Sequence, residues 1–223
     1  MCGRFTLAVD PEALMVRYHL QDIPFPFQQR YNISPSQYIP AVISNDGVNR
    51  VGLLKWGLVP SFSKDDKMAY KMINARAETV SEKPSFRNLL KRKRAIVPGN
   101  SFFEWRSDVR GKQPMRIMMK NEEIFSFAAL YDTWVNPKGE KLHTCTIITT
   151  SPNELVLPIH NRMPVILRPE NETDWLNREI EDTDYLKSFL VPYDEQEMKA
   201  YPVHNMVGNV RNDSPECIAP LAQ

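Results

Sequence analysis

Short apolar runs separated by polar turns dominate the chain, and they predict a protein rich in β-strands. Residues 38–44 and 48–56 are joined by Asn45-Asp46-Gly47, a sequence typical of a tight hairpin turn. Residues 143–150 are rich in Thr and Ile, which favours another strand. Further strands are expected at 95–97 and 102–106, around Pro98-Gly99-Asn100, at 115–120 and 124–130, joined near Asn121, and at 165–167.

Helices are expected to be few and short. Asp10, Pro11 and Glu12 are typical of a helix start, and that helix should end near His19. The remaining assignments are short helices at 85–93, 172–177 and 184–190, a proline-punctuated loop at 21–36, an irregular stretch at 61–82 and a tail from Val191 that wraps the body. Because no internal repeat or linker is visible, we expect one compact α+β domain over residues 1–223, dominated by antiparallel strands.

The composition narrows the class of protein. Eighteen prolines against eight glycines agree with many turns. The three cysteines, at positions 2, 145 and 217, form an odd and sparse set, which favours a reducing compartment over a disulfide framework. The first ten residues do not resemble a secretory signal, and no stretch approaches the roughly 20 apolar residues of a membrane span. We therefore expect a cytoplasmic protein without membrane contact.

The net charge of +1 conceals an uneven distribution of charged residues. Residues 1–110 carry 17 Lys and Arg against 10 Asp and Glu, whereas residues 111–223 carry 11 against 17. Residues 83–94 alone hold six positive charges and no acid. This separation allows one face to meet a polyanion while the molecule stays nearly neutral. Two solvated helices of opposite charge would produce the same pattern.

Cys2 is the first candidate for chemistry. Methionine aminopeptidase normally trims Met1 when a small residue follows, so we expect a mature chain that begins with Cys2. An N-terminal cysteine carries an amine with a pKa near ~8 and a thiol near ~8.5, and both are usable nucleophiles at neutral pH. With an aldehyde, such a group forms an imine and then closes to a thiazolidine. The alternative is a buried structural cysteine, and a retained Met1 would block the amine.

Three other polar residues have a possible chemical role. Glu104 lies in Phe102-Phe103-Glu104-Trp105, and burial there would raise its pKa toward neutrality, whereas an outward side chain would be an ordinary surface acid. His160 lies between Pro158 and Pro164 and is either a proton carrier or a simple surface histidine. Asn74 begins Asn74-Ala75-Arg76-Ala77-Glu78, which is also a plausible capped helix start.

Several other chemistries lack their sequence signals. His143 and Cys145 share one strand face, but no second pair has the spacing of metal ligands. The sequence contains no glycine-rich phosphate loop and no G-x-S-x-G nucleophile motif. We therefore expect neither a metal nor an organic cofactor.

The order of five motifs along the chain resembles the SOS-response-associated peptidase (SRAP) family, whose members process abasic sites in single-stranded DNA. The motifs are Met1-Cys2-Gly3-Arg4-Phe5, Trp56-Gly57-Leu58-Val59-Pro60, Asn74-Ala75-Arg76-Ala77-Glu78, Phe103-Glu104-Trp105 and Ile159-His160-Asn161-Arg162-Met163-Pro164. They extend from residue 1 to about residue 168, and the resemblance implies a single SRAP-type domain over nearly the whole chain.

The resemblance implies a covalent role for Cys2. Its amine and thiol would capture the aldehyde of an abasic site as a thiazolidine and shield that site. Asn74 would help to hold Cys2 and the sugar. Glu104 would shuttle protons, and His160 would stabilise or protonate the opened sugar oxygen, in agreement with the proton transfers that imine formation needs.

The expected partner is single-stranded DNA that contains abasic sites. Arg4, Arg76 and Arg162 would contact phosphates, Trp56 and neighbouring loop residues would stack on bases, and the basic segment 83–94 would extend the track. We expect little sequence specificity, because an abasic nucleotide has no base to read. A monomer is adequate, and it would be associated with the nucleoid when bound to DNA.

Two other functions fit some of the same residues. An N-terminal cysteine can attack peptide bonds, as in N-terminal-nucleophile amidohydrolases, and the family name and removal of Met1 are compatible with that activity. A single-strand binder or docking domain without catalysis would need the basic face and not Cys2. An adduct on abasic DNA that survives a denaturing gel distinguishes the covalent function from both.

Overall fold

The computed structural model describes residues 2–109 and 111–221, and its larger sheet closes into a small barrel. Across this sheet the order is β11 (Met163–Pro164), β10 (Lys141–Thr150), β4 (Val48–Trp56), β3 (Tyr38–Asn45), β6 (Arg94–Gly99), β9 (Phe125–Val135) and β12 (Ile166–Leu167). Because β9 also pairs with β10, strands β10, β4, β3, β6 and β9 form a closed ring. The short β5 (Asn74–Arg76) pairs with β10 in parallel.

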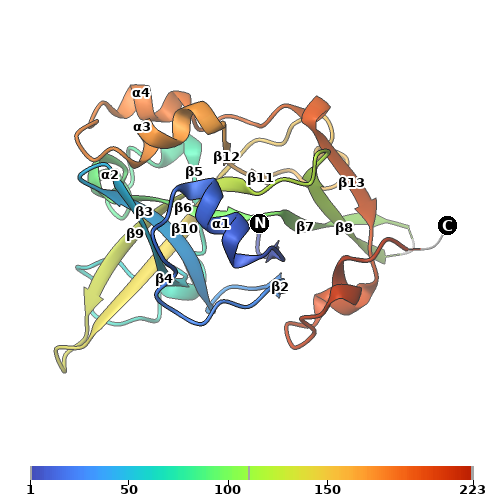
Figure 1. The fold of residues 1–223 in the computed structure, drawn as a ribbon, viewed down its shortest axis with the longest axis horizontal. Coiled ribbons are helices and arrows are strands. Elements are labelled where there is room, and N and C mark those ends of the chain that lie inside the picture. The colour runs from blue at the N-terminus through green and yellow to red at the C-terminus, as the bar shows by residue number, and fades with distance from the viewer. Residues whose placement is uncertain (1, 110, 222–223) are drawn as a thin grey trace.

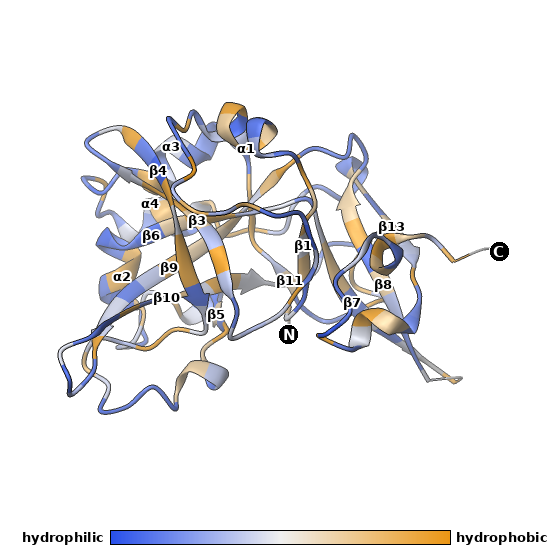
Figure 2. Cartoon of the chain, turned by 60° about the horizontal axis from the view of Figure 1, so that its bottom comes forward, coloured by the Kyte–Doolittle hydropathy of each residue, from blue (hydrophilic) through white to orange (hydrophobic). Residues whose placement is uncertain are grey.

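A smaller antiparallel sheet lies beside the barrel. Its order is β13 (Met198–Pro202), β8 (Gly111–Met119), β7 (Ser101–Asp108), β1 (Phe5–Leu7) and β2 (Arg30–Ile33). Figure 1 shows the barrel strands on the left and β7, β8 and β13 on the right. The segment that leads into β1 lies between the two sheets, close to β7 and β11 in both views (Figures 1 and 2).

The helices are short, as predicted, and the α+β fold class is confirmed. The α-helices of the described residues are α1 (Pro11–Tyr18), α2 (Arg87–Arg92), α3 (Glu172–Leu176) and α4 (Thr183–Ser188). Single 3₁₀ turns complete the list: η1 (Ala69–Lys71), η2 (Ala77–Thr79), η3 (Pro169–Asn171), η4 (Glu195–Glu197), η5 (Asn205–Gly208) and η6 (Pro215–Ile218). In the part of the chain described, no helix has the length and apolar character needed to cross a bilayer.

The hairpin predicted at Asn45-Asp46-Gly47 is confirmed. Strands β3 and β4 pair in antiparallel register from Tyr38 opposite Lys55 to Asn45 opposite Val48. Asp46 and Gly47 both adopt positive φ angles, of 51° and 76°. Two consecutive positive φ values are characteristic of the type I′ turn, whose twist matches that of the paired strands.

The strands on either side of Asn100 belong to different sheets. The chain leaves the barrel at Gly99 and enters β7 at Ser101, so the predicted turn is a crossover between the sheets rather than a hairpin. The connection from β8 to β9 near Asn121 is a second crossover. Gly99 is required for close packing, because a Cβ there would lie 2.7 Å from the Phe127 ring.

Two predictions about irregular segments were wrong in part. The loop assigned to 21–36 contains β2, and the stretch 61–82 contains β5; the tail, for which no strand was predicted, contains β13. Asn74 therefore lies on a strand and does not cap a helix. These strands are only three to five residues long, and each pairs with a strand distant in the sequence, so local propensity gives little indication of them.

An aromatic cluster fixes the first strand against the barrel. The Phe5 ring makes edge contacts with Trp56 and Phe127, with centroids 5.4 Å and 5.5 Å away. All three side chains are buried. Figure 2 shows that hydrophobic colour is concentrated on the strands, while the outer loops are mostly hydrophilic.

Polar contacts fix the same strand at its far end. The Asn100 amide oxygen accepts hydrogen bonds from the Thr6 hydroxyl (2.6 Å) and the Ala8 backbone N–H (3.1 Å). Its amide nitrogen donates to the Ala8 carbonyl at 3.3 Å, and the side chain is 7% exposed. The crossover residue thus holds the N-terminal strand in register.

We predict that Asn100→Ala destabilises the fold by about 2 kcal/mol, because it leaves buried polar groups of the first strand without partners. Chemical denaturation measures the change in the free energy of unfolding. The matched control is Asn205→Ala, an exposed amide on η5, which should change stability by less than about 0.5 kcal/mol. Equal stability of the two variants would show that Asn100 does not hold the strand.

Candidate active site

The pairing of β1 with β7 brings Cys2 to Glu104. Phe5 lies opposite Phe102, and the Phe103 backbone N–H donates to the Arg4 carbonyl at 2.9 Å. Cys2 and Glu104 are 5% and 3% exposed, and the thiol and the carboxyl group interact with each other. Glu104 is therefore an inward-facing acid. Met1, whose removal the sequence predicts, lies outside the described residues.

Burial controls the protonation of this pair. It raises the pKa of the Cys2 thiol well above its ordinary value, and the adjacent Glu104 charge raises it further, while Arg162 opposes the shift. Burial also raises the pKa of Glu104, although the contacts with Cys2 and His160 oppose that change. The thiol is consequently neutral at physiological pH, in contrast to the usable thiolate fraction expected from the sequence.

His160 faces the same carboxyl group. Its Nε2 lies 3.8 Å from Glu104 Oε2. On the other side of the ring, Nδ1 lies 3.1 Å from the Arg162 backbone nitrogen and 3.2 Å from the Arg162 carbonyl oxygen. The neutral ring accepts the N–H, and the protonated ring donates to the carbonyl, so both protonation states have a partner at Nδ1.

Arg162 is held by an ion pair. Its Nη1 and Nη2 donate to the two carboxylate oxygens of Glu78, at 2.6 Å and 3.0 Å. Nη2 also donates to the Thr149 carbonyl at 2.6 Å. The predicted phosphate ligand thus already has a protein partner, and its positive charge acts on Cys2 as well.

Strand β5 adds Asn74 and Arg76 beside β10. Asn74 is in register with Ile147, and Arg76 with Thr149. The Asn74 amide nitrogen donates to the Ile147 carbonyl at 3.3 Å, whereas its buried Oδ1 has no hydrogen-bond partner among residues 2–109 and 111–221. Arg76 is exposed. Asn74 therefore has a vacant acceptor, and Arg76 has a guanidinium group that solvent can reach.

Arg4 has a structural position. Its Nη1 donates to Asn32 Oδ1 at 2.9 Å and to the Val207 carbonyl at 2.6 Å. Its Nη2 donates to the Gly208 carbonyl at 3.2 Å. These bonds tie the N-terminal segment to η5, so the predicted phosphate contact would have to compete with them.

Trp56 does not present a surface to DNA, contrary to the prediction. It is 1% exposed, and its indole N–H donates to the Ile73 carbonyl at 2.9 Å. The loop after it instead exposes Phe62 (68%) and Tyr70 (65%), two residues that were not named in the prediction that loop residues near Trp56 also stack on bases. Aromatic residues interspersed with Lys64, Lys67 and Lys71 were the available signal.

The basic segment 83–94 is largely occupied by structural contacts. Arg94 is 3% exposed and donates to backbone carbonyls that include Leu90 and Trp175. Lys93 pairs with Asp132 at 2.6 Å, and Arg92 pairs with Glu181. Three of the six positive charges that were expected to extend the DNA-binding surface are therefore already engaged in contacts within the protein.

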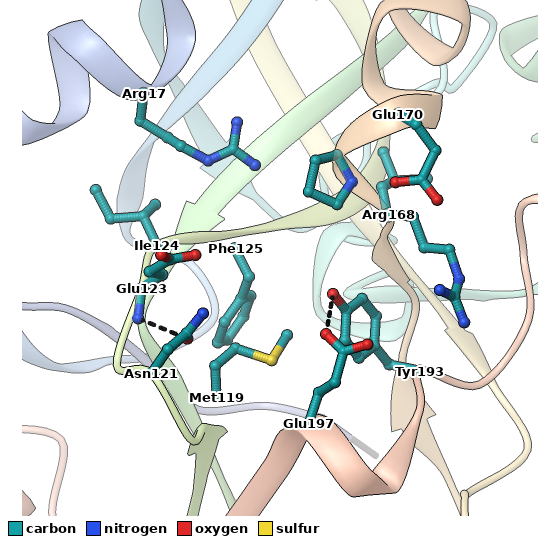
Figure 3. Close-up of a pocket in the computed structure, with 12 residues that line it drawn as sticks. Arg17, Met119, Asn121, Glu123, Ile124, Phe125, Arg168, Glu170, Tyr193 and Glu197 are labelled. Atoms are coloured by element: carbon teal, nitrogen blue, oxygen red, sulfur yellow. Dashed lines mark hydrogen bonds between the residues drawn. The ribbon is translucent and has the colours of Figure 1, made fainter.

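A separate cleft of about 420 Å³ lies between the β8–β9 connection and η3 (Figure 3). Its charged lining is mixed and includes Arg17, Arg168, Glu170 and Glu197. None of the residues predicted for the site lines it. In the described part of the chain, no cluster of three or more His, Cys, Asp or Glu has the arrangement of a metal site.

The sequence and the fold match a known class of protein. The chain belongs to the SOS response associated peptidase (SRAP) family, whose model matches residues 1–210. It is 52% identical over 221 residues to Abasic site processing protein YoqW of Bacillus subtilis, covering 98% of this chain and 99% of that protein. It is 34% identical to Abasic site processing protein HMCES of Gallus gallus, covering 87% and 67% of the two chains.

A solved structure supports the fold. A protein from Bacteroides thetaiotaomicron is 32% identical, and its structure covers 99% of this chain and 100% of its own with a TM-score of 0.89. The two-sheet arrangement is therefore shared over nearly the full length.

We predict that Glu104→Gln makes the protein more stable at about pH 8. Because folding raises the Glu104 pKa, the folded protein binds that proton more tightly than the unfolded chain, and stability falls as pH rises from the ordinary carboxyl range toward the raised value. Gln removes this dependence, so the gain should shrink toward about pH 4.

Urea denaturation at both pH values measures the effect of Glu104→Gln. The control is Glu154→Gln, an exposed acid that should produce no comparable pH-dependent gain. A Glu104→Gln variant that loses stability at both pH values would contradict a buried, desolvated carboxyl group.

Proposed function

We propose that this protein captures abasic sites in single-stranded DNA by a covalent bond to Cys2, after residue 1 is removed. The observation that carries the proposal is the buried contact between the Cys2 thiol and Glu104, with His160 facing the same carboxyl group. The printed names of the relatives, which describe abasic site processing, support this substrate. All of these side chains come from one chain, so a monomer suffices, acting in the cytoplasm or on the nucleoid.

The chemistry requires both nucleophiles of Cys2. The amine adds to the aldehyde carbon of the opened sugar, and the resulting carbinolamine loses water to give an imine. The thiol sulfur then bonds to the imine carbon, and the nitrogen receives a proton. The products are one thiazolidine and one water molecule, with no change in oxidation state.

The raised pKa of the thiol supports an order in which the amine reacts before the thiol. A neutral thiol is a poor nucleophile, so the amine attacks first. Glu104 accepts the thiol proton as sulfur bonds to the imine carbon, because the thiol and the carboxyl group already interact in the buried site. His160 stabilises or protonates the oxygen released when the sugar ring opens, and its Nδ1 contacts are compatible with both of its protonation states.

The surrounding residues bind the strand. The vacant Oδ1 of Asn74 accepts a hydrogen bond from the Cys2 amine or a sugar hydroxyl. Exposed Arg76 contacts a flanking phosphate. Phe62 and Tyr70 replace Trp56 as the aromatic residues that stack on bases.

Amide hydrolysis is the second candidate function, because the family name includes the word peptidase. The same Cys2–Glu104 pair would then activate the thiol toward a carbonyl carbon. A hydrolase forms only a transient acyl-enzyme, whereas a thiazolidine on DNA survives denaturing electrophoresis.

We predict that Cys2→Ala abolishes the stable adduct with a single-stranded abasic oligonucleotide, as measured by denaturing gel and intact mass. Cys145→Ala and Cys217→Ala should retain it, because both of those thiols are fully buried. A non-removable extension before Cys2 should also abolish it, since an amide nitrogen cannot form the imine. Full adduct yield from the extended protein would exclude the ring and favour thiol-only chemistry.

We predict that Arg76→Ala weakens non-covalent binding to single-stranded DNA and lowers the salt slope by about 0.7, the loss of one phosphate contact. Fluorescence anisotropy over a range of salt concentrations measures both quantities. Arg50→Ala, which removes an exposed charge near the hairpin end of β4, is the control and should leave the slope unchanged. The same slope for all three proteins would remove Arg76 from the DNA interface.

A further inference from the structure

Glu78 places a negative charge between two arginines of the proposed DNA surface. It lies on η2, two residues after Arg76, and forms a two-pronged ion pair with Arg162. The Arg162 hydrogen bond is the main reason that the pKa of Glu78 lies below its usual range, and Arg76 contributes as well, so Glu78 is ionised at neutral pH. A carboxylate at this position repels phosphate, so a binding role does not explain it.

The ion pair connects the two segments that supply the site. Glu78 follows β5, which carries Asn74, whereas Arg162 precedes β11 and is two residues from His160. Both segments flank β10, and the Thr149 carbonyl of that strand accepts a further bond from Arg162. The Arg162 side chain is 17% exposed and that of Glu78 is 50% exposed, so this is a partly buried clamp.

The backbone of Arg162 is the support of the His160 ring. Its N–H and carbonyl both lie within hydrogen-bond distance of Nδ1, and that contact aims Nε2 at Glu104. Fixing the Arg162 side chain at both Glu78 and Thr149 restricts the backbone that holds the ring. A forked guanidinium–carboxylate pair is suited to this because it fixes direction as well as distance.

We propose that Glu78 is a positioning residue, which holds Arg162 and thereby aims the His160 ring, while its charge weakens binding to DNA. The expected effect on the rate of adduct formation rests on the proposed function. Glu78 therefore has opposite effects on two measurable quantities. It lowers the affinity for DNA, and it raises the rate of the covalent step.

The kinetic test compares Glu78→Gln with Glu82→Gln, which removes the same charge at an exposed position four residues further along. Affinity is measured with a strand that contains tetrahydrofuran, an abasic analogue without an aldehyde, and the adduct rate is measured at saturating abasic DNA. We expect Glu78→Gln to bind a few-fold more tightly and to form the adduct about 10-fold more slowly. Glu82→Gln should keep the wild-type adduct rate.

A second comparison shows whether Glu78 acts through Arg162. In an Arg162→Ala background, Glu78→Gln should cause no further loss of adduct rate, because the pair is already broken. Glu78→Asp keeps the charge but is shorter by one methylene, so it should keep wild-type affinity and lose part of the rate. This variant carries the test if Glu78→Gln does not fold, and a wild-type rate in Glu78→Asp would then overturn the proposal.

A chemistry-independent measurement separates this proposal from the proposed function. The NMR chemical shifts of the His160 ring at a fixed pH, assigned by comparison with His160→Ala, should differ between wild type and Glu78→Gln and agree between wild type and Glu82→Gln. Failure of the wild-type protein to form any adduct would refute the proposed function alone. Unchanged His160 ring signals in Glu78→Gln, or a wild-type adduct rate, would overturn the positioning role of Glu78.

Discussion

The contact between the Cys2 thiol and the buried carboxyl group of Glu104 is the interaction on which the rest of this site depends. It exists because the three-residue strand β1 is held on three sides: by β7 through the backbone, by Trp56 and Phe127 through the Phe5 ring, and by Asn100 through hydrogen bonds. A chain terminus is ordinarily loosely ordered. Here the fold places the segment from Cys2 to Arg4 between two sheets, where a reactive side chain can be oriented.

Burying polar and ionisable side chains beside Cys2 lowers the stability of the folded protein, and the unfavourable groups are concentrated at the site. Within the described residues, the buried side-chain polar atoms without a hydrogen-bond partner belong to Asn74, Thr79, Glu104, Thr146 and Arg162. Three of these five are residues predicted for the site from sequence. Buried polar groups are normally satisfied, so such a concentration is expected where a ligand is to complete the hydrogen bonds. The raised pKa values of Cys2 and Glu104 have the same origin in burial.

The sequence predicted much of the fold because its longest strands have local signals. The β3–β4 hairpin is identified by its turn residues, and β10 by its run of Thr and Ile. The sequence at Asn100 resembles a hairpin turn because the same residue types occur in hairpin turns and in crossovers between sheets. The two kinds of connection differ only in which distant strands the flanking strands pair with. Strand β7 buries Phe102, Phe103 and Glu104 together, so alternation could not show which way the acid faces.

The charged residues show why composition alone is a poor guide to a binding surface. Arg94 donates hydrogen bonds to backbone carbonyls, Lys93 forms an ion pair with Asp132, and Arg4 donates to carbonyls of η5. These charges therefore stabilise the fold and are less available to attract a polyanion. Trp56 also has a structural position, because this residue of the second motif is buried in the core. Other basic residues remain exposed to solvent: Arg76, the lysines among residues 61–73, and Lys83, Arg87 and Lys91 of the basic segment, while Arg162 is clamped by Glu78. Arg76 lies in register with Thr149, and Arg162 donates to the Thr149 carbonyl, so these two arginines lie next to the same residue of β10.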